Sequence, residues 1–524
     1  MAQERAIVAA ALYLSGAGSE EEIPSFWIEE LEAVRPVRIN RDGLRPGLLL
    51  TEYQVASIRD YRTSSGDILS LEELSLVDGF SAEWVAALGP FVSLESARKA
   101  GDADTVRTRA TVLVRGTLTS VGAKAKVSGE SWRAGAAFRG RDGTFHAELT
   151  GRFGRVTAGD FNLRFGQGLA LWSGFSMTSL STVDAFFQRS AGLSPVWSYT
   201  SGLGYRGLAY SYSGRHWSGT AFAALGGSFG GHLARLSRHG QTGLTAFLSG
   251  GELTLSADTR WNIRGADLAA EVALRQGSPA VKSAFRMRLG ELFKLAVQGR
   301  VMPSKFSGRK NGEYGLALGG AFSSGRWVTL AGKSGFGSSV PGHRVSLTAD
   351  AALLPIPGTD PRRLQVRIYG VWQWQISSLW ALDARFTERY RNYENPRTDF
   401  RADVRFGSGP WLGTGRLENV FCEGYGLLSY LEGGYKADSW STYLRLTGFH
   451  IGHWDDRIFV YERDAAGTFS VPAYYGKGAA FSAVGSFKHR FRRLTVKANL
   501  RAACQPRAGR VPDYTLNLQI QCDL

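Results

Sequence analysis

The residues with the chemistry to bind a metal ion gather in one short stretch, HIGHWDD, at positions 450–456. His450, His453, Asp455 and Asp456 bring two imidazoles and two carboxylates close together along the chain, and zinc accepts both kinds of ligand. On a strand, side chains three positions apart point to opposite faces, so the two imidazoles splay apart. We therefore interpret this stretch as a loop at the mouth of a larger structure and predict no metal site.

Motifs of enzyme chemistry are missing. The glycines of GLGYRG at 202–207 lack the strand–turn–helix setting of a dinucleotide site, and GFGSSVPG at 335–342 lacks the Gly-Lys-Ser/Thr of a phosphate loop. The eight histidines are scattered along the chain and nominate no catalytic triad. We expect a protein that is not an enzyme, with no catalytic residue and no cofactor.

The composition favours strands over membrane-spanning helices. Glycine supplies 65 of the 524 residues, aromatic residues 12% and charged residues 21%. The longest apolar run, residues 6–14, is nine residues long, whereas a spanning helix needs roughly 18–20. Three cysteines, Cys422, Cys504 and Cys522, form no disulfide framework and match no metal-site spacing. These features fit a β-barrel in which every second residue faces lipid.

From about residue 105 onward, the sequence reads as strand after strand. In YTLNLQIQCDL at 514–524, leucine and isoleucine share one face while asparagine and glutamine share the other. RLQVRIYGVWQWQI at 363–376 alternates in the same way. Because lipid offers the backbone no hydrogen bonds, such strands must close into a barrel. Over residues 99–524 we predict a large transmembrane antiparallel β-barrel of about 20–24 strands.

Residues 1–98 differ in kind and are predicted to form a small all-α domain. The first hundred residues hold 9 Lys and Arg against 16 Asp and Glu, whereas the remainder carries a net charge of +23. Helices are predicted at 51–62, 70–77 and 81–92. Residues 1–18 read either as a short signal peptide or as a helix.

This N-terminal region resembles the helix-hairpin-helix module of competence-type DNA-binding proteins. The resemblance rests on VRIN at 37–40, YRTSSGDILSLEEL at 61–74 and LVDGF at 76–80. Such modules bind DNA phosphates through backbone N–H groups of glycine-rich turns. Here the two turns carry carboxylates beside the phosphate positions, and their residues are Thr51, Glu52, Asp78 and Gly79. The departure favours docking of a protein partner, plugging of the barrel or a structural cap over DNA binding.

The stretch GDFNLRFGQGLALWSGF at 159–175 is predicted to be a further strand by the same alternation. Gly166 and Gly168 leave room for a plug, loop or ligand backbone close to the wall. Together with the N-terminal region and VPAYYGKG at 471–478, this stretch resembles bacterial outer-membrane barrel proteins that carry a helix-hairpin-helix region. The resemblance implies architecture and no activity. The candidate lumen or plug contacts are Arg164, Gly166, Gly168, Tyr474, Tyr475 and Lys477.

These patterns lead to one function and one alternative. The first is a non-enzymatic outer-membrane scaffold or channel, surrounded by outer-membrane lipid, whose module in the periplasm docks a protein partner or plugs the lumen. The alternative is a DNA-uptake channel in which the module captures nucleic acid. Neither the oligomeric state nor the identity of a partner follows from the sequence.

Overall fold

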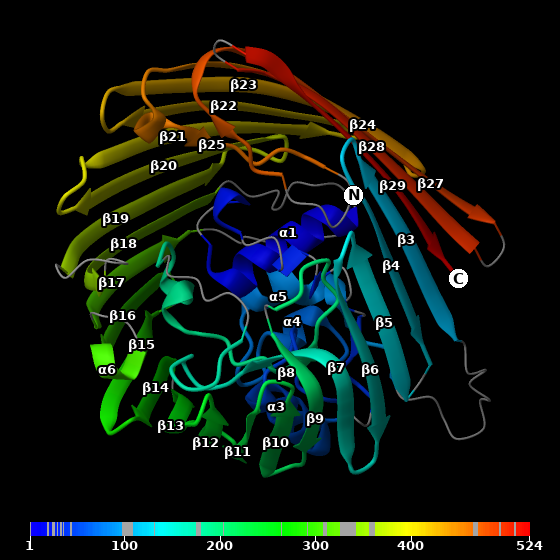
Figure 1. The fold of residues 1–524 in the computed structure, drawn as a ribbon, viewed down its shortest axis with the longest axis vertical. Coiled ribbons are helices and arrows are strands. Elements are labelled where there is room, and N and C mark those ends of the chain that lie inside the picture. The colour runs from blue at the N-terminus through cyan, green and yellow to red at the C-terminus, as the bar shows by residue number, and fades with distance from the viewer. Residues whose placement is uncertain are drawn as a thin grey trace.

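One closed antiparallel barrel of 24 strands dominates this computed structural model (Figure 1). The number of strands lies at the upper end of the predicted range, and the predicted fold class is confirmed. The structure describes residues 2–524 except 18–19, 24–26, 29, 32–33, 35, 42–43, 97–107, 130, 174–179, 203, 264, 291, 308–311, 325–341, 356–361, 465–469, 492–493 and 508–509. The expected boundary between residues 98 and 99 therefore lies outside the described residues.

The wall strands follow one another around the barrel in chain order, and β29 pairs with β3 to close it. In the first half they are β3 (Arg109–Thr117), β4 (Val121–Ser128), β5 (Trp132–Arg139), β6 (Asp142–Gly151), β7 (Gly154–Arg164), β9 (Tyr205–Ser213), β10 (Trp217–Ala224), β11 (Ser228–Ser237), β12 (Gly240–Ser249), β13 (Glu252–Ile263), β14 (Ala266–Arg275) and β15 (Ser278–Leu289). In the second half they are β16 (Phe293–Met302), β17 (Glu313–Ser323), β18 (Gly342–Pro355), β19 (Arg362–Gln375), β20 (Trp380–Arg391), β21 (Arg397–Ser408), β22 (Trp411–Phe421), β23 (Tyr425–Lys436), β24 (Trp440–Ile451), β27 (Gly476–Phe491), β28 (Leu494–Arg507) and β29 (Arg510–Asp523).

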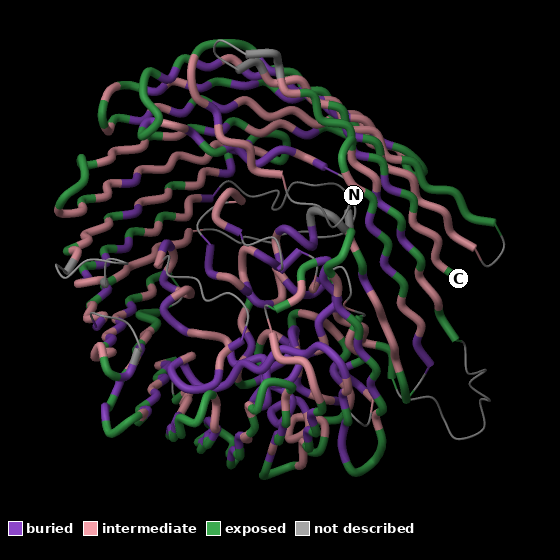
Figure 2. Tube along the Cα trace, viewed as in Figure 1, coloured by how far each residue is buried: buried purple, intermediate pink, exposed green. Residues whose placement is uncertain are grey.

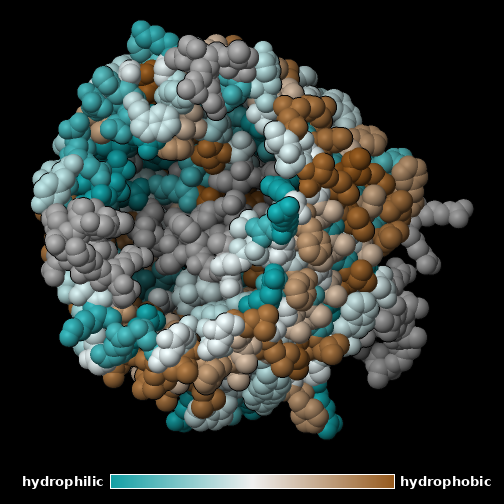
Figure 3. All heavy atoms as spheres, viewed as in Figure 1, coloured by the Kyte–Doolittle hydropathy of each residue, from teal (hydrophilic) through white to brown (hydrophobic). Residues whose placement is uncertain are grey.

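The outer surface of the wall is apolar because every second side chain points away from the barrel. On β29, Leu516, Leu518 and Ile520 are exposed, while Asn517 and Gln519 between them are buried on the inner face. Figure 3 shows the same property as broad hydrophobic areas on the outside of the molecule. An apolar outer face on a barrel without free edges meets the requirements for spanning a bilayer. None of the helices in the described part of the chain has the length and apolar character to do so.

A charge on this outer face should destabilise the barrel according to its depth. Leu446 lies at the middle of β24, is exposed, and pairs in register with the exposed Leu431 and Phe481. Leu446→Arg is expected to lower the free energy of unfolding by about 2–4 kcal/mol in lipid vesicles. Leu225→Arg is the matched control, because Leu225 is equally apolar and exposed but lies in the turn between β10 and β11. A change below about 1 kcal/mol is expected there, and equal effects at both positions would contradict the membrane assignment.

The wall has two heights. Strands β3 to β7 and β9 to β10 are 8–11 residues long, whereas β18 to β24 and β27 to β29 are 11–16 residues long. The pairings differ accordingly, with seven register positions between β4 and β5 and fourteen between β18 and β19. A second layer of chain lies inside the barrel against short strands such as β5 and β9 and against β14 to β17.

That inner layer is formed by residues 160–200, in their described part. β7 leaves the wall near Phe161, pairs from there with the short strand β8 (Gly192–Pro195), and ends at Arg164. The expectation of a wall strand over 159–175 is therefore wrong beyond this point, because residues 160–165 are buried on both faces. The 3-10 turn η3 (Val183–Phe186) continues the layer. The inner layer as a whole packs on small inward side chains of the wall, among them Ala137, Ala209, Ala269, Ala273, Ala280, Ala284, Ala296 and Ala317.

A second segment folds inward between β24 and β27. It contains the 3-10 turn η4 (Trp454–Asp456) and the paired strands β25 (Ile458–Phe459) and β26 (Ala473–Tyr474). Its apolar side chains pack with those of Val420, Leu428 and Phe449 on the inner face of the wall. A short helix, α6 (Ser304–Ser307), follows β16.

The N-terminal module lies inside the barrel (Figure 1). Its elements are α1 (Ala2–Ser15), η1 (Glu20–Glu22), β1 (Val37–Arg38), α3 (Glu52–Ser65), α4 (Leu71–Leu74), α5 (Ala82–Leu88), η2 (Gly89–Phe91) and β2 (Val92–Ser93). The two strands pair in parallel and so add a small sheet to the expected helices. Residues 2–15, the region open to two interpretations, form a helix that packs on α5.

The module has an apolar core and well-capped helices. Trp84, Leu31, Val55 and Ile58 are buried in one cluster, and Figure 2 shows buried chain at the centre of the barrel. The side chains of Ser70 and Ser81 accept hydrogen bonds from the first turns of α4 and α5, as residues of this type do at helix N-termini. In the described residues, the helices expected at 51–62, 70–77 and 81–92 appear at 52–65, 71–74 and 82–88.

Candidate functional site

The candidate site is the interface between the N-terminal module and the inner wall, where polar side chains dominate. At one end of the barrel α3 meets the tight hairpins. Tyr53 Oη donates to Arg238 O (2.9 Å) between β11 and β12, and Arg59 Nη1 donates to Gly214 O (2.8 Å) between β9 and β10. Near the same end of the barrel, Glu83 of α5 pairs with Lys294, the second residue of β16 (2.5 Å). These contacts hold the module at this rim.

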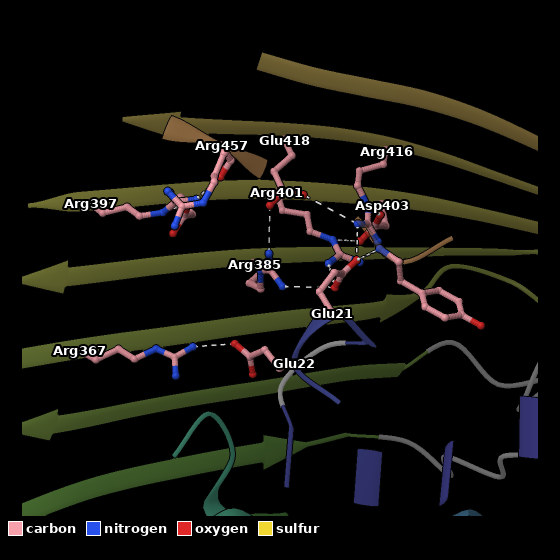
Figure 4. A network of polar contacts seen from close by, with 12 residues as sticks. Glu21, Glu22, Arg367, Arg385, Arg397, Arg401, Asp403, Arg416, Glu418 and Arg457 are labelled. Carbon is pink, nitrogen blue, oxygen red and sulfur yellow. Dashed lines mark hydrogen bonds and ion pairs between the residues drawn. The ribbon is translucent and has the colours of Figure 1, made fainter. Parts of the chain in front are cut away.

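Two neighbouring glutamates of the 3-10 turn η1 reach an arginine-rich part of the wall (Figure 4). Glu21 Oε1 lies 2.6 Å from Arg416 Nη1, and Glu21 Oε2 lies 2.8 Å from Arg401 Nη1. Glu22 Oε1 lies 2.7 Å from Arg367 Nη2. The three arginines come from β22, β21 and β19, so one short turn of the module joins three wall strands.

The electrostatics of this contact favour the docked module. Burial alone would raise the pKa of Glu21, but the guanidinium groups of Arg401 and Arg385 lower it to about 2. A carboxylate whose pKa is lowered in the docked state stabilises docking at pH values above its normal pKa. This stabilisation is lost as the pH falls to the lowered pKa. The contact also joins the net negative module to the net positive remainder of the chain, so charges separated in sequence meet in space.

Arg164 forms the most buried ion pair between the module and the inner layer. Its two terminal nitrogens bind the two oxygens of Glu30, each at 3.0 Å, and its guanidinium lies over the ring of Trp27. Asn162 Nδ2 donates to the same carboxylate at 2.7 Å. A bidentate guanidinium–carboxylate pair fixes direction as well as charge. The arrangement fixes Glu30 of the module against the end of β7.

Gly166 and Gly168 shape a loop around a carboxylate from the wall. Both have positive φ, +61° and +83°, a backbone conformation that favours glycine. The loop turns three N–H groups toward Glu271 of β14, which accepts from Gln167 N (2.7 Å), Leu169 N (3.0 Å) and Ala170 N (3.1 Å). A Cβ on Gly166 would lie 2.6 Å from Glu271 Oε2. The open space expected at this glycine is therefore taken by a wall side chain.

The four hairpin-turn residues lie in two different settings. Thr51 caps α3, and its side chain and that of Gln54 close a capping box. Gly79 has a φ of +84°, accepts from Gln54 Nε2 at 2.8 Å, and leaves room for the ring of Tyr53. Asp78 is exposed, whereas Glu52 is buried against the wall. Gln54 thus connects the two turns, and only the second turn leaves its carboxylate accessible.

Glu52 is a buried acid at the boundary between module and wall. Burial raises its pKa to about 7, and the nearby Ser218 hydroxyl of β10 offsets only part of that shift. Its Oε2 has no hydrogen-bond partner among the described residues. The docked module therefore binds a proton at a pH where a solvent-exposed glutamate is ionised.

The stability of the folded chain should depend on pH through Glu52. Because the pKa is raised, its contribution is complete below the normal value of 4.5 and falls as the pH rises to about 7. The loss amounts to about 3 kcal/mol. The denaturant midpoint of the detergent-solubilised chain should thus be lower at about pH 8 than at about pH 5. Glu52→Gln should reduce this difference, and an unchanged difference would count against the assignment.

The residues singled out in VPAYYGKG separate. Tyr474 is buried between the second inward segment, to which it belongs, and the wall. It donates a hydrogen bond to Glu462, which also pairs with Arg501 of β28. Tyr475 packs edge-on against Trp454. Lys477 pairs in register with His450 on the exposed outer face. Its side chain was expected in the lumen and lies outside it. Of the six candidate lumen contacts, the structure joins Arg164 directly to the module.

The potential metal ligands do not converge. His450 is on the outer face of β24, while Asp456 is buried and accepts from Glu423 N at 3.2 Å. Within the described residues, no group of three or more His, Cys, Asp or Glu side chains is placed to hold a metal ion. All three cysteines are free.

A cavity of about 1230 Å³ remains in the lumen beside Glu21 and Glu22. Its lining comes mainly from inward side chains of β18 to β21 and from the connection between β20 and β21. Seen down the barrel, the molecule is hollowed, and hydrophilic side chains gather at the upper left of Figure 3. The module therefore occupies part of the lumen and leaves a polar space beside it.

Glu21, Glu22, Glu30, Glu83 and Glu271 were not singled out from the sequence. Each is an ordinary glutamate in its local context, and the first four become functional only when the module enters the barrel. The one signal that could have indicated them is the opposite net charge of the two regions, which predicts that acids of the first meet arginines of the second.

No family model matches this sequence, and no curated protein does. Among solved structures, the chain is similar to the P pilus usher (PapC) translocation pore, with a TM-score of 0.37 and 10% identity over 79% of this chain and 98% of that chain. An Escherichia coli P pilus tip assembly intermediate containing PapC gives 0.42 and 9% over 82% and 62%. OpdK, an outer membrane protein of Pseudomonas aeruginosa, gives 0.30 and 8% over 80% and 99%.

Proposed function

We propose that this protein is a non-enzymatic outer-membrane channel whose N-terminal module plugs the lumen. The carrying observation is the contact of Glu21 and Glu22 with Arg416, Arg401 and Arg367 inside the barrel. An acidic plug on a basic wall is held by charge and remains separable. Burial of large apolar surfaces between them would make the contact permanent, as in obligate interfaces.

We place the tight-turn end of the barrel in the periplasm. Outer-membrane barrels have short periplasmic turns and longer external loops. The end that carries Leu524 also carries the tight turns after β6, β9 and β11, and α3 contacts two of these. The opposite end carries the long segments after β7 and β24, while the Leu524 end carries one long connection, residues 324–341 after β17. With this orientation, the module enters the lumen from the periplasmic side.

A periplasmic protein partner would bind the module through α4. Leu69 and Leu76 flank this helix and are 77% and 83% exposed, the highest values among the exposed large apolar residues of the module. Apolar side chains exposed on both sides of one short helix are the kind of surface that a protein partner covers. Capture of defined envelope proteins by the tagged wild-type chain, and their loss with Leu69→Ser/Leu76→Ser, would support this role.

Capture of nucleic acid is the weaker proposal. Phosphate binding by a helix-hairpin-helix turn needs accessible N–H groups and no competing carboxylate. Glu52 is buried against the wall, and Asp78 lies at the other turn. Negligible affinity of the full chain for duplex DNA at about 150 mM salt is expected, whereas tight binding with a steep inverse salt dependence would revive this function.

Conductance in planar bilayers tests the plug. The wild-type chain should be mostly closed. Glu21→Gln/Glu22→Gln should open more often and for longer, because three wall arginines lose the carboxylates that the module supplies. The matched control is Glu72→Gln/Glu95→Gln, which removes the same charge from exposed positions of the module. Equal open times in all three proteins would overturn the proposal.

A further inference from the structure

Three arginines stand side by side across the inner wall of the cavity. Arg389 of β20 pairs in register with Arg367 of β19 on one side and with Arg397 of β21 on the other. Directly opposed residues on neighbouring strands have Cβ atoms about 5 Å apart, and like charges there destabilise a sheet. Negatively charged groups that bind to such a row reduce this repulsion and stabilise the sheet.

Acidic side chains pair with most of the arginines that line the cavity, but not with Arg389, the middle arginine of this row. Eight arginines are among the described lining residues: Arg300, Arg363, Arg367, Arg385, Arg389, Arg391, Arg397 and Arg457. Seven of them have an acidic partner, including Glu22 for Arg367 at 2.7 Å and Asp399 for Arg397 at 2.9 Å. No hydrogen bond or ion pair to Arg389 occurs within the described part of the chain.

The neighbouring pair of arginines shows what such a site binds. Arg385 and Arg401 are also opposed in register, four residues further along the same two strands. There the carboxylate of Glu21 lies 2.8 Å from Arg401 and 4.0 Å from Arg385. The same inner wall thus binds an oxyanion where the module supplies one, and lacks one at Arg389, where the cavity is open.

We propose that Arg389 is the centre of a binding site for small, multiply charged oxyanions, with Arg367 and Arg397 adding positive potential on both sides. A guanidinium binds carboxylate and phosphate oxygens in the same bidentate manner, so these two chemistries define the ligand class. The cavity of about 1230 Å³ is large enough for a solute well beyond the size of inorganic phosphate. Binding does not require the plug to move, so this site goes beyond the proposed channel and stands or falls independently of it.

Calorimetric titration of the detergent-solubilised full chain tests the site, at low ionic strength so that exposed charges are not screened. Pyrophosphate and citrate serve as probes. Arg389→Gln should weaken binding of the preferred probe at least about tenfold, and Arg389→Lys, which keeps the charge without the planar fork, should lie between. Preference for pyrophosphate would identify phosphate-bearing solutes, and preference for citrate would identify carboxylates.

Arg405→Gln is the matched control, because Arg405 lies on the same inner face of β21, pairs with Asp383, and does not line the cavity. It removes the same charge and should leave the affinity within about twofold of the wild type. The thermal midpoint of Arg389→Gln should equal or exceed that of the wild type, because the substitution relieves repulsion within the row. The proposal would be overturned if neither pyrophosphate nor citrate binds. Equal losses of affinity in Arg389→Gln and Arg405→Gln would also overturn it.

Discussion

Glu271→Ala is expected to lower the free energy of unfolding by about 3–9 kcal/mol and to release the loop that follows β7. Its carboxylate accepts the N–H groups of Gln167, Leu169 and Ala170 in a buried setting. Each buried donor left without an acceptor costs about 1–3 kcal/mol. Hydrogen exchange of these three amides should accelerate more than exchange elsewhere in the barrel. Glu252→Ala removes an exposed carboxylate from the neighbouring strand β13 and should change stability by less than about 0.5 kcal/mol.

Two glycines of the same loop provide an independent check. Gly166→Ala places a Cβ 2.6 Å from the carboxylate of Glu271, whereas the nearest atom to a Cβ on Gly168 lies 3.4 Å away, in the ring of Trp172. Both substitutions strain a left-handed residue by about 1–2 kcal/mol, and the first also pushes the carboxylate out of reach of its donors. Gly166→Ala should therefore reproduce the exchange pattern of Glu271→Ala, and Gly168→Ala should not.

The second large effect is expected at the buried ion pair between module and inner layer. Arg164→Met leaves Glu30 charged and without its cation, a change that costs about 3–5 kcal/mol in buried sites. We expect frequent channel openings, because Glu30 holds the module against β7. The double variant Arg164→Met/Glu30→Gln removes the unpaired charge and should recover much of the stability.

An exposed ion pair between the module and a turn of the wall gives the control. Arg215 and Asp60 lie 3.4 Å apart, with side chains 63% and 43% exposed, against 0% and 10% for Arg164 and Glu30. Exposed pairs contribute about 0–1 kcal/mol, so Arg215→Gln should leave the channel closed. Openings as frequent as in Arg164→Met would show that burial of the pair is not what holds the module.

The barrel could be predicted from the sequence because its cause is local. A strand with one face in lipid must alternate, and the alternation in β29 or β19 is complete within a dozen residues. The course of residues 159–175 could not be predicted in this way. Its alternation is just as regular, but both faces are buried, and its path depends on Glu271, a residue about a hundred positions later in the chain.

The site was less accessible to prediction than the fold. Arg164 was singled out as part of the stretch 159–175, and Lys477 as part of VPAYYGKG at 471–478. The first contacts the module, whereas the second lies on the outer face. The glutamates that dock the module stand in ordinary helical or turn sequences, so their role arises from an interface between regions hundreds of residues apart. Only the segregation of charge was visible beforehand.

The unequal wall has a consequence for the bilayer around it. A strand of eight residues such as β4, β5 or β10, tilted by about 45°, rises only about 19 Å, whereas strands of fourteen residues such as β18 or β28 rise about 33 Å. Annular lipids beside the short strands must compress and tilt their acyl chains to match, while those on the opposite side remain near their relaxed thickness. We therefore expect the bilayer to be thinner along the flank of the short strands than along the opposite flank.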